Sequence, residues 1–458
     1  MSTGGGEAGR EIGTLGATAI VAGAMLGVGI FLTPHLVAQS VSSPGLFLLL
    51  WALGGGLAVA GAVTYGELGA MMPDAGGDYV YLGRAFGATL SFAAGVVLFV
   101  GVFGGSIASM SAAVSQYQLS LLFGRVGVDL AASWIPVAGG LSLTGVEVVA
   151  IALILGLTVL NVLGVRLSSH TQTVLTLVPV VVLSAFAVFA LLTAPHATAV
   201  PPPAPSGGPG AIGEALLNIY FAYAGWNAVA YVGGEVADPG RTIPRALLLG
   251  TGLVTGLYLL LCASWIAVLG MGGIAQAFES GTAAARALFG PNAEWMVALI
   301  IAIALVGSVN ATVLGGARIG YAMGRDGALP ASLGELSPGA RVPARALWAQ
   351  ALLSIALVVT GTFEELVQLT SVAMFLLGSL TVLALFTLRR REPDVECPYR
   401  ASLYPLLPSL YLLTAVAVVG LEVRNYVVGD AESGLPLLGI GVFAGVWLLR
   451  RTFPGRDA

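Results

Sequence analysis

Apolar stretches separated by short polar segments run through almost the whole chain. A transmembrane helix needs about 20 consecutive apolar residues, and the stretches that lack Asp, Glu and Arg have about that length or more. The first stretch, 12–66, is long enough for two helices, which we divide at Ser42-Ser43-Pro44-Gly45. The others are 85–124, 148–165, 167–213, 215–234, 246–278, 295–317, 346–363, 366–388, 401–421 and 433–449. This pattern predicts an all-α integral membrane protein with 12 transmembrane helices.

Ten of the predicted helices form two sets of five with similar lengths, at 12–193 and 211–390. Because five is odd, the second set must lie inverted in the membrane relative to the first. Inverted repeats of this kind build secondary transporters, whose substrates bind near the middle of the membrane at discontinuous helices. The remaining segments are a cytoplasmic N-terminal tail at 1–11, an external Pro-rich loop at 194–210, and two extra helices with a cytoplasmic tail at 391–458.

The first helix of each set carries residues that favour an interruption. In helix 1, Gly27 and Gly29 lie one residue apart, and each glycine costs a helix about 1 kcal/mol. In helix 6 the corresponding run, 221–227, has Gly225 among small residues. Close packing of helices is the alternative, since Gly23 and Gly27 also form a small-xxx-small pair. Matched positions in the two repeats favour discontinuous helices 1 and 6.

An interrupted helix leaves backbone groups that suit a zwitterion. Free N–H groups near Gly27, Val28 and Gly29 would carry partial positive charge and suit a carboxylate. Freed carbonyl groups suit an ammonium group, and they are expected at Ala24, Met25, Phe221, Ala222 and Ala224. Both charges occur close together in an α-amino acid. The site needs no ionised side chain, which would be expensive in lipid.

The predicted substrate-binding residues are therefore Ala24, Met25, Gly27, Val28, Gly29, Ile30, Phe221, Ala222, Ala224, Gly225 and Asn227. Apart from Asn227, the side chains expected in the wall are apolar. An apolar wall rejects charged side chains and separates apolar ones only weakly, so the sequence predicts neutral L-amino acids. The amide of Asn227 is expected either to contact the substrate or to bind the backbone of a neighbouring helix.

Composition agrees with a membrane protein and excludes several other classes. Of the 458 residues, 57% are hydrophobic and 9% are charged, against about 25% charged in soluble proteins. All 19 basic residues are Arg, so lysine chemistry is excluded and no nucleic-acid-binding basic patch is present. The three histidines and two cysteines are widely separated, so we expect no metal site, disulfide framework or cofactor. We find no enzymatic nucleophile–base pair, and no ring of charge or filter motif of a channel.

The arginines predict the orientation of the chain. Placing the N-terminus in the cytoplasm leaves only Arg125, Arg286 and Arg424 in external loops, and the other sixteen arginines in cytoplasmic segments. Positive residues concentrate in cytoplasmic loops. We therefore expect a multi-pass protein of the cell membrane, inner or plasma, with both termini in the cytoplasm.

Few carboxylates lie near the predicted site. Glu67 and Glu235 are expected near the cytoplasmic face, as gating or structural ion pairs with arginine or, alternatively, as a proton relay. The run 76–81, with Asp78, belongs to the first cytoplasmic loop and is expected to pack as part of an inner gate. Spans 1, 3, 6, 8 and 10 offer no carboxylate at mid-membrane depth for a dication, which disfavours the alternative of an organic amine or polyamine carrier.

Several motifs resemble the amino acid–polyamine–organocation superfamily, and within it the L-type amino acid transporters and their bacterial relatives. The resemblance covers nearly all of 12–390. The matching stretches are Gly27-Val28-Gly29-Ile30-Phe31, Tyr65-Gly66-Glu67-Leu68-Gly69 through Pro73, Gly76-Gly77-Asp78-Tyr79-Val80-Tyr81, 221–227, Asp238-Pro239 with Ile243-Pro244-Arg245-Ala246, and Ser308-Val309-Asn310 with Arg318 and Arg325-Asp326-Gly327. The resemblance implies a LeuT-type fold, sodium-independent amino acid transport or exchange, and an aromatic gate at Phe221 that closes over substrate from outside.

Three positions depart from the family pattern. Val28 replaces a common Ser, which removes one hydroxyl contact to the substrate carboxylate. Pro179 stands where the family often has a Lys that substitutes for sodium, and Gly315-Gly316-Ala317 replaces a Ser-rich stretch of span 8. The sequence thus predicts a sodium-independent secondary transporter or exchanger that works by alternating access. Its expected partners are the amino acid and the lipid bilayer, and no obligate protein partner is readable from the sequence.

Overall fold

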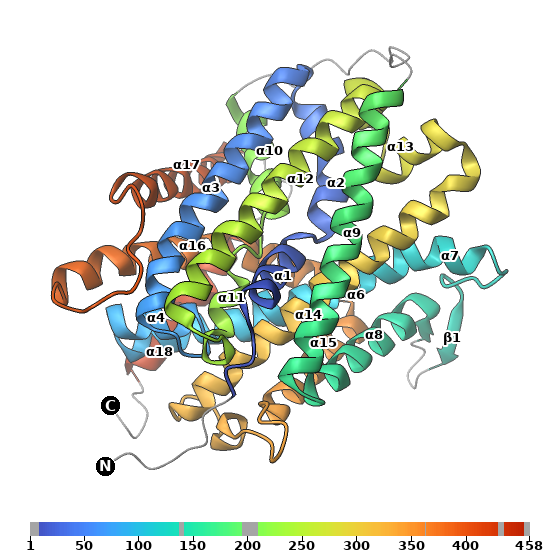
Figure 1. Ribbon diagram of the computed structural model, residues 1–458. Coiled ribbons are helices and arrows are strands. Elements are labelled where there is room, and N and C mark those ends of the chain that lie inside the picture. Colours follow the sequence, from blue (N-terminus) through green and yellow to red (C-terminus); the bar gives the residue numbers. More distant parts are fainter. Residues whose placement is uncertain (1–8, 137–141, 195–208, 362, 429–434, 453–458) are drawn as a thin grey trace.

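The computed structural model describes residues 9–136, 142–194, 209–361, 363–428 and 435–452, and helices form most of them (Figure 1). Within these ranges, six helices are long and apolar enough to cross a membrane. They are α3 (Pro44–Met71), the continuous segment Ala88–Gly124, α8 (Gly145–Val162), α9 (Val165–Thr193), α12 (Pro239–Gln276), and α14 (Glu294–Arg325) with the short η4 (Pro291–Ala293) before it. The bent pair α1 (Thr14–Met25) and α2 (Val28–Ser40) makes a seventh if it counts as one span.

The other helices are shorter or less apolar. Six of them overlap the remaining predicted apolar runs. They are α10 (Pro209–Ala222), α11 (Ala228–Tyr231), α15 (Ala344–Thr360), α16 (Phe363–Arg391), α17 (Leu406–Val428) and α18 (Leu435–Thr452). The connecting segments form α4 (Asp78–Phe86), η3 (Gly233–Glu235), α13 (Ser280–Phe289) and η5 (Ala331–Gly334). The chain therefore belongs to the helical membrane proteins.

The division of the first apolar run falls where it was predicted. The Ser43 side chain accepts a hydrogen bond from the Leu46 N–H, and Pro44 occupies the first position of α3. A serine cap followed by proline is a strong signal for a helix start, because the hydroxyl satisfies a free N–H and proline has none to satisfy.

Both predicted helix interruptions are present. The first predicted helix is interrupted between Met25 and Val28, and the chain bends by 40° from α1 to α2. The second interruption separates α10 from α11, between Ala222 and Ala228. The two interruptions touch through backbone, because a Cβ atom at Gly29 would lie 2.4 Å from Ala222 Cα.

The segment Ala88–Gly124 is one long helix with two π-helical sections. Helices α5 (Ala88–Val96), α6 (Gly105–Ala113) and α7 (Ser120–Gly124) are joined by η1 (Val97–Gly104) and η2 (Val114–Leu119). A π-helical turn widens a helix locally and is frequent at functional sites. Here η1 and α6 face the cavity described below.

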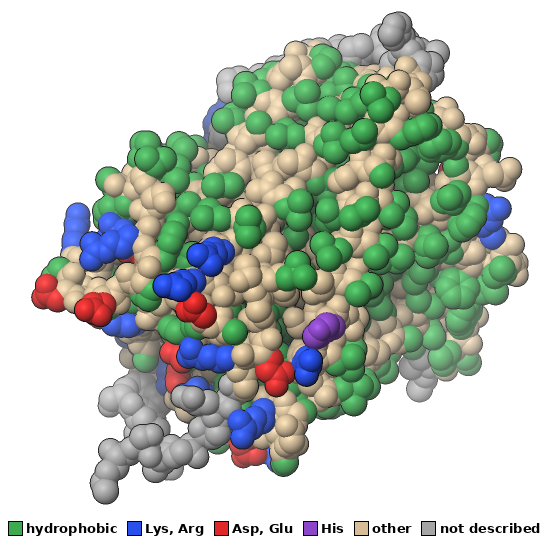
Figure 2. Space-filling model, in the orientation of Figure 1, with side chains coloured by type: hydrophobic (Ala, Val, Ile, Leu, Met, Phe, Trp, Pro, Cys, Tyr) green, Lys and Arg blue, Asp and Glu red, His purple; other side chains and the backbone are tan. Residues whose placement is uncertain are grey.

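The interior is built around α1, which lies near the centre of Figure 1 and packs against α9, α12 and α14. Buried aromatic rings fill the space between α3, α10 and α12, where Trp51 packs against Tyr223 and Tyr258. In contrast, α9 exposes a row of large apolar side chains, including Val174, Val181 and Leu192. Figure 2 shows a broad apolar face, with most of its charged side chains gathered at the lower left. Apolar surface of this extent requires lipid or another protein as its surroundings.

The described residues also contain one feature that the all-α prediction omitted. β1 (Ser133–Pro136) and β2 (Ser142–Thr144) form an antiparallel pair between α7 and α8. The Thr144 and Glu147 side chains then cap α8 reciprocally. The Pro-rich loop predicted at 194–210 lies almost wholly outside the described residues, as do most of the N-terminal tail and the last residues of the C-terminal one.

Candidate functional site

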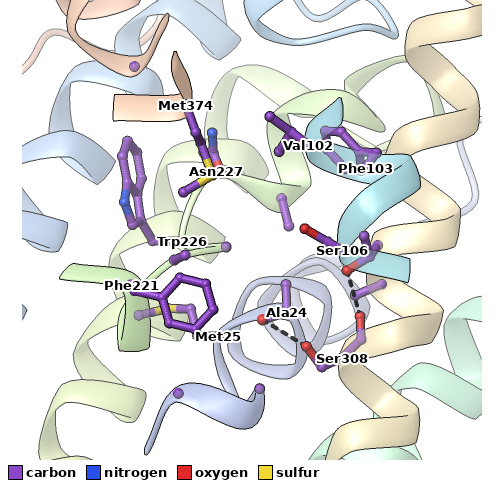
Figure 3. A pocket seen from close by; sticks show the side chains of 18 of the residues that line it. Ala24, Met25, Val102, Phe103, Ser106, Phe221, Trp226, Asn227, Ser308 and Met374 are labelled. Atoms are coloured by element: carbon purple, nitrogen blue, oxygen red, sulfur yellow. Dashed lines mark hydrogen bonds between the residues drawn. The ribbon is translucent and has the colours of Figure 1, made fainter. Parts of the chain in front are cut away.

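A cavity lies where the two interruptions meet (Figure 3). Its wall includes ten of the eleven predicted substrate-binding residues: Ala24, Met25, Gly27, Val28, Gly29, Phe221, Ala222, Ala224, Gly225 and Asn227. Ile30, the eleventh, is not in the wall. Its side chain is fully buried in the hydrophobic core, because the first turn of α2 points it away from the cavity. The structure therefore brings the two distant segments together at one site.

Hydroxyl groups bind the carbonyls that the interruptions free. Ser308 Oγ on α14 donates to Ala24 O at 3.1 Å. The Tyr258 hydroxyl on α12 reaches both Met25 O and Ala222 O, the latter at 3.2 Å. Tyr258 thus ties the end of α1 to the end of α10, which holds both interruptions in place.

The N-terminus of α2 faces the same cavity. Gly27 precedes this helix in an extended conformation and supplies no side-chain cap. The Gly27 N–H donates to Met25 O at 2.7 Å. The first N–H groups of a helix have no partner within it, and Val28 and Gly29, which begin α2, lie in the cavity wall. This end of α2 can therefore accept an anionic group.

Hydroxyl side chains line the wall opposite Phe221 and Trp226, with Ser106 and Ser308 labelled in Figure 3. The serine and threonine residues of the wall are Ser106, Ser109, Ser308 and Thr312, from α6 and α14. The prediction of an all-apolar wall apart from Asn227 was therefore incomplete. Spacings of three and four residues place each pair on one helix face, so this signal was readable in the sequence.

Asp78 is the carboxylate that sequence reasoning placed outside the cavity. It begins α4, is only 2% exposed, and lies in the cavity wall. The hydroxyls of Tyr65 and Tyr231 donate to its two carboxylate oxygens. As predicted, spans 1, 3, 6, 8 and 10 offer no acid to the cavity. The connecting helix α4 supplies one instead, because segment 72–78 folds back against α11.

Glu67 and Glu235 form ion pairs with arginine, as one of the two expectations had it. Glu235 makes a bidentate pair with Arg318, with both side chains almost fully buried. Glu67 pairs with Arg389 and also accepts from the Ala401 N–H at 2.6 Å. Neither glutamate is in the cavity wall.

A further pair, Arg84–Glu392, is partly exposed, and Arg84 lines a surface hollow together with Arg325. Glu392 lies just after the end of α16. The hydrogen bond from the Arg84 guanidinium lowers the pKa of the Glu392 carboxyl below its ordinary value.

The span-8 residue that faces the interruption differs from the one expected. Gly315 and Gly316 pack against Phe103, whereas Ser308, about two turns earlier, contacts Ala24. The stretch Gly315-Gly316-Ala317 has no hydroxyl, as the sequence showed, and Ser308 of the same helix supplies one at the interruption. Pro179 is buried within α9.

One turn before Pro179, Thr176 donates to Ala19 O at 3.0 Å. Uncharged side chains thus fill the region where α1, α9 and α14 meet. Among the described residues, no group of three or more His, Cys, Asp or Glu side chains is arranged to hold a metal ion.

Phe221, the expected aromatic gate, lies at the edge of the cavity with 44% of its surface exposed. The ion pairs of Glu67 and Glu235 are formed in the same structure.

Comparison with known proteins shows what the chain is similar to. The family model described as amino acid permease matches residues 12–444 of this chain. The b(0,+)-type amino acid transporter 1 of Mus musculus is 29% identical over 423 residues, which cover 89% of this chain and 82% of that protein. The serine/threonine exchanger SteT of Bacillus subtilis (strain 168) is 28% identical, over 95% of this chain and 97% of its own length. The large neutral amino acids transporter small subunit 2 of Homo sapiens is 28% identical, over 96% and 82%. With its two helix interruptions and nearly its whole length matched, this chain is a member of the amino acid permease family, within the amino acid–polyamine–organocation superfamily.

Proposed function

We propose that this protein is a secondary active transporter or exchanger that moves neutral L-amino acids across the membrane by alternating access, without sodium. The observation that carries the proposal is the cavity formed by the two helix interruptions. It presents the N-terminus of α2 beside the carbonyls of Ala24 and Ala222. The relatives named above are amino acid transporters and exchangers.

The backbone of the site suits both charges of an amino acid. The N–H groups at the start of α2 complement the carboxylate. A carbonyl oxygen has two lone pairs, so Ala24 O can accept from a substrate ammonium while it keeps its bond from Ser308. We infer that Asn227, whose amide already donates to the Tyr231 hydroxyl at 3.3 Å, contacts the substrate from the other side.

The walls favour an uncharged side chain. Met25, Ala222 and Ala224 are apolar, and the hydroxyl set on α6 and α14 can bind a substrate hydroxyl without any ionised partner. An acidic or basic substrate side chain would lose its hydration and find no free opposite charge, which is costly.

An amine or polyamine carrier is the second candidate, and Asp78 is the observation that favours it, because a dication needs an acid in the pocket. Both carboxylate oxygens of Asp78, however, already accept from tyrosine hydroxyls. An ammonium group would have to displace one of them. We therefore rank neutral amino acids first.

We also infer a LeuT-type arrangement of 12 spans in two inverted repeats, with both termini in the cytoplasm of a plasma or inner membrane. Helices at each predicted run, the corresponding positions of the two interruptions, and the arginine distribution support it. In this arrangement Phe221 is the outer gate, and the pairs of Glu67 and Glu235 hold the inner side closed.

Competition for uptake tests the substrate class. Purified protein in liposomes loaded with alanine should exchange it for labelled alanine, and several neutral amino acids such as serine, threonine and leucine should compete. Arginine, glutamate and putrescine should compete at least about tenfold less well, because a charged group in this wall has no partner. Equal competition by putrescine would favour the amine carrier, and absence of any exchange would overturn the transporter proposal.

Sodium replacement tests the coupling ion. A bound sodium ion needs several oxygen ligands at short range from one point, but the hydroxyls of Thr176, Ser308 and Tyr258 each contact a different carbonyl of α1, those of Ala19, Ala24 and Met25. Pro179 supplies no hydroxyl. Uptake should therefore stay the same when choline replaces sodium at constant pH. A loss of more than about tenfold in substrate affinity, which corresponds to about 1.4 kcal/mol, would show that a sodium site exists.

A further inference from the structure

Helix α17 contributes to the cavity, although it lies outside the two sets of five helices predicted from the sequence. One of its faces carries exposed apolar side chains, such as Leu413 and Val416. Spacings of three and four residues place Tyr411, Ala415 and Val418 on the other face, and all three are buried. The helix packs against α3, α10 and α16. Tyr411 is also part of the cavity wall, so an added helix supplies a side chain to the proposed substrate site.

Tyr411 reaches the wall where α16 has no side chain. A Cβ atom at Gly378 would lie 2.9 Å from the Tyr411 hydroxyl oxygen and 3.9 Å from the ring carbon that carries this oxygen. The Tyr220 hydroxyl on α10 is hydrogen-bonded to the same oxygen at 2.9 Å. Gly378, Tyr220 and Tyr411 all belong to the cavity wall. The absence of a side chain at Gly378 therefore makes room for the hydroxyl group of Tyr411.

Aromatic neighbours hold the Tyr411 ring in this place. It packs edge-on against Trp226, with ring centroids 6.1 Å apart, and stacks with Phe375 at 6.4 Å. The side chain has no exposed surface. Because protein interiors are close-packed, such a ring cannot turn away without displacing its neighbours. The Tyr411 ring is therefore a fixed part of the wall.

This part of the wall lies far from the groups proposed to bind the substrate backbone. Figure 3 shows Met374 across the cavity from Ala24, with Trp226 on the same side as Met374. Gly378 lies one turn further along α16 than Met374, and Tyr411 lies beside Trp226. A substrate side chain that extends away from Ala24 on this side approaches Gly378 and Tyr411.

The space in front of Tyr411 is small. The cavity has a volume of about 150 Å³, and a protein cavity of about this volume holds one benzene molecule. An aromatic amino acid has a ring of that size in addition to its carboxylate and ammonium groups. Its ring would therefore need space that Tyr411 occupies.

We propose that Tyr411 is a specificity residue, whose ring closes the cavity behind Gly378 and limits the length of the substrate side chain. The inference rests on the proposed amino acid transport and narrows its substrate class. The substrates are neutral amino acids with aliphatic or hydroxyl side chains, and aromatic amino acids are excluded. If Tyr411 served only to pack α17, its replacement would lower stability and leave the order of substrates unchanged.

Competition by phenylalanine measures this limit. Liposomes that contain the protein exchange labelled alanine, and we compare the concentrations of alanine, leucine and phenylalanine that halve the exchange. Phenylalanine should require at least about tenfold more than leucine, because overpacking a filled site is costly. In Tyr411→Ala, the ratio of the phenylalanine to the alanine concentration should fall by at least about tenfold, because the deleted ring leaves a cavity.

Gly378→Ala tests the limit in the opposite direction and retains the ring. Its methyl group must displace the Tyr411 hydroxyl, which leaves less space at this end of the cavity. Leucine should then compete about tenfold less well relative to alanine, since one methyl group in an apolar pocket has an effect of this size. The double variant Gly378→Ala/Tyr411→Phe lacks the hydroxyl, and the nearest ring carbon, at 3.9 Å, makes an ordinary contact. It should regain competition by leucine. This pair of variants tests the proposal even where Tyr411→Ala does not fold.

Val418→Ala is the matched control. It removes buried apolar volume from the same face of α17, two turns beyond Tyr411, at a residue that does not line the cavity. Its concentration ratios should equal those of the unmodified protein.

The outcomes separate this inference from the proposed function. Equal competition by phenylalanine and leucine in the unmodified protein would overturn the inference, as would unchanged ratios in Tyr411→Ala or in Gly378→Ala. A double variant that does not regain competition by leucine would also overturn it. In all these cases alanine exchange by the unmodified protein leaves the proposed function standing. Absence of that exchange would instead overturn the proposed function.

Discussion

Replacing Arg318 with Gln should destabilise the protein by about 3 to 5 kcal/mol, because the change leaves the Glu235 carboxylate buried without its partner. The two side chains are 1% and 4% exposed, and the guanidinium makes three hydrogen bonds to the carboxylate. Glu235→Gln should have a similar effect. The loss should appear as a shorter half-life on heating in detergent, measured by the fraction that remains monodisperse.

The exposed pair Arg345–Glu335, with side chains 60% and 61% exposed, is the matched control. Surface pairs contribute about 1 kcal/mol or less, so Arg345→Gln should leave the half-life almost unchanged. A double variant, Arg318→Met with Glu235→Leu, should recover much of the loss, since it removes both charges together. Equal stability of Arg318→Gln and Arg345→Gln would contradict the prediction.

Substituting Gly29 with Ala should abolish most transport while the protein still folds. The added Cβ would lie 2.4 Å from Ala222 Cα, and backbone at this distance cannot be moved by a side-chain rotation. The two interruptions must then separate by about an ångström, and a misplacement of this size in a preorganised site costs about a hundredfold in activity. Alanine exchange in liposomes should fall by about that factor.

Gly225→Ala offers an independent check on the other interruption. This residue has φ 96°, a conformation that side chains rarely adopt, and its Cβ would meet Ala24 O at 2.8 Å. Gly256→Ala is the control, since a Cβ there meets nothing within 4 Å; alanine favours a helix over glycine by up to about 1 kcal/mol. Normal exchange by Gly29→Ala would show that the contact between the interruptions is not required.

The two interruptions were predictable because their cause is local. Paired glycines at 27 and 29, and Gly225 at the corresponding place in the second set, weaken a helix wherever it folds. The start of α3 was equally local, since Ser43 and Pro44 define it by themselves. Apolar runs predicted where the helices lie for the same reason: each run alone satisfies the length that a bilayer requires.

Features that depend on distant contacts were not predictable. Asp78 follows two glycines in a polar segment that reads as a loop, and only its pairing with α11 buries it. The π-helical sections of Ala88–Gly124 have no clear signal in an apolar run. The sequence spacing shows that the hydroxyls of α6 share one face of that helix and those of α14 one face of theirs. It does not show that both faces line the same cavity, which depends on how the two helices pack.

Two of the ion pairs described above, Arg84–Glu392 and Arg318–Glu235, differ in exposure, and dissolved salt distinguishes between them. Charges at the surface are screened over about 8 Å at physiological ionic strength, whereas buried pairs are screened far less. Arg84–Glu392 therefore weakens as electrolyte is added on its side of the membrane, and Arg318–Glu235 keeps its strength. The free energy that these two ion pairs contribute thus has one part set by the bathing solution and another set by the protein interior.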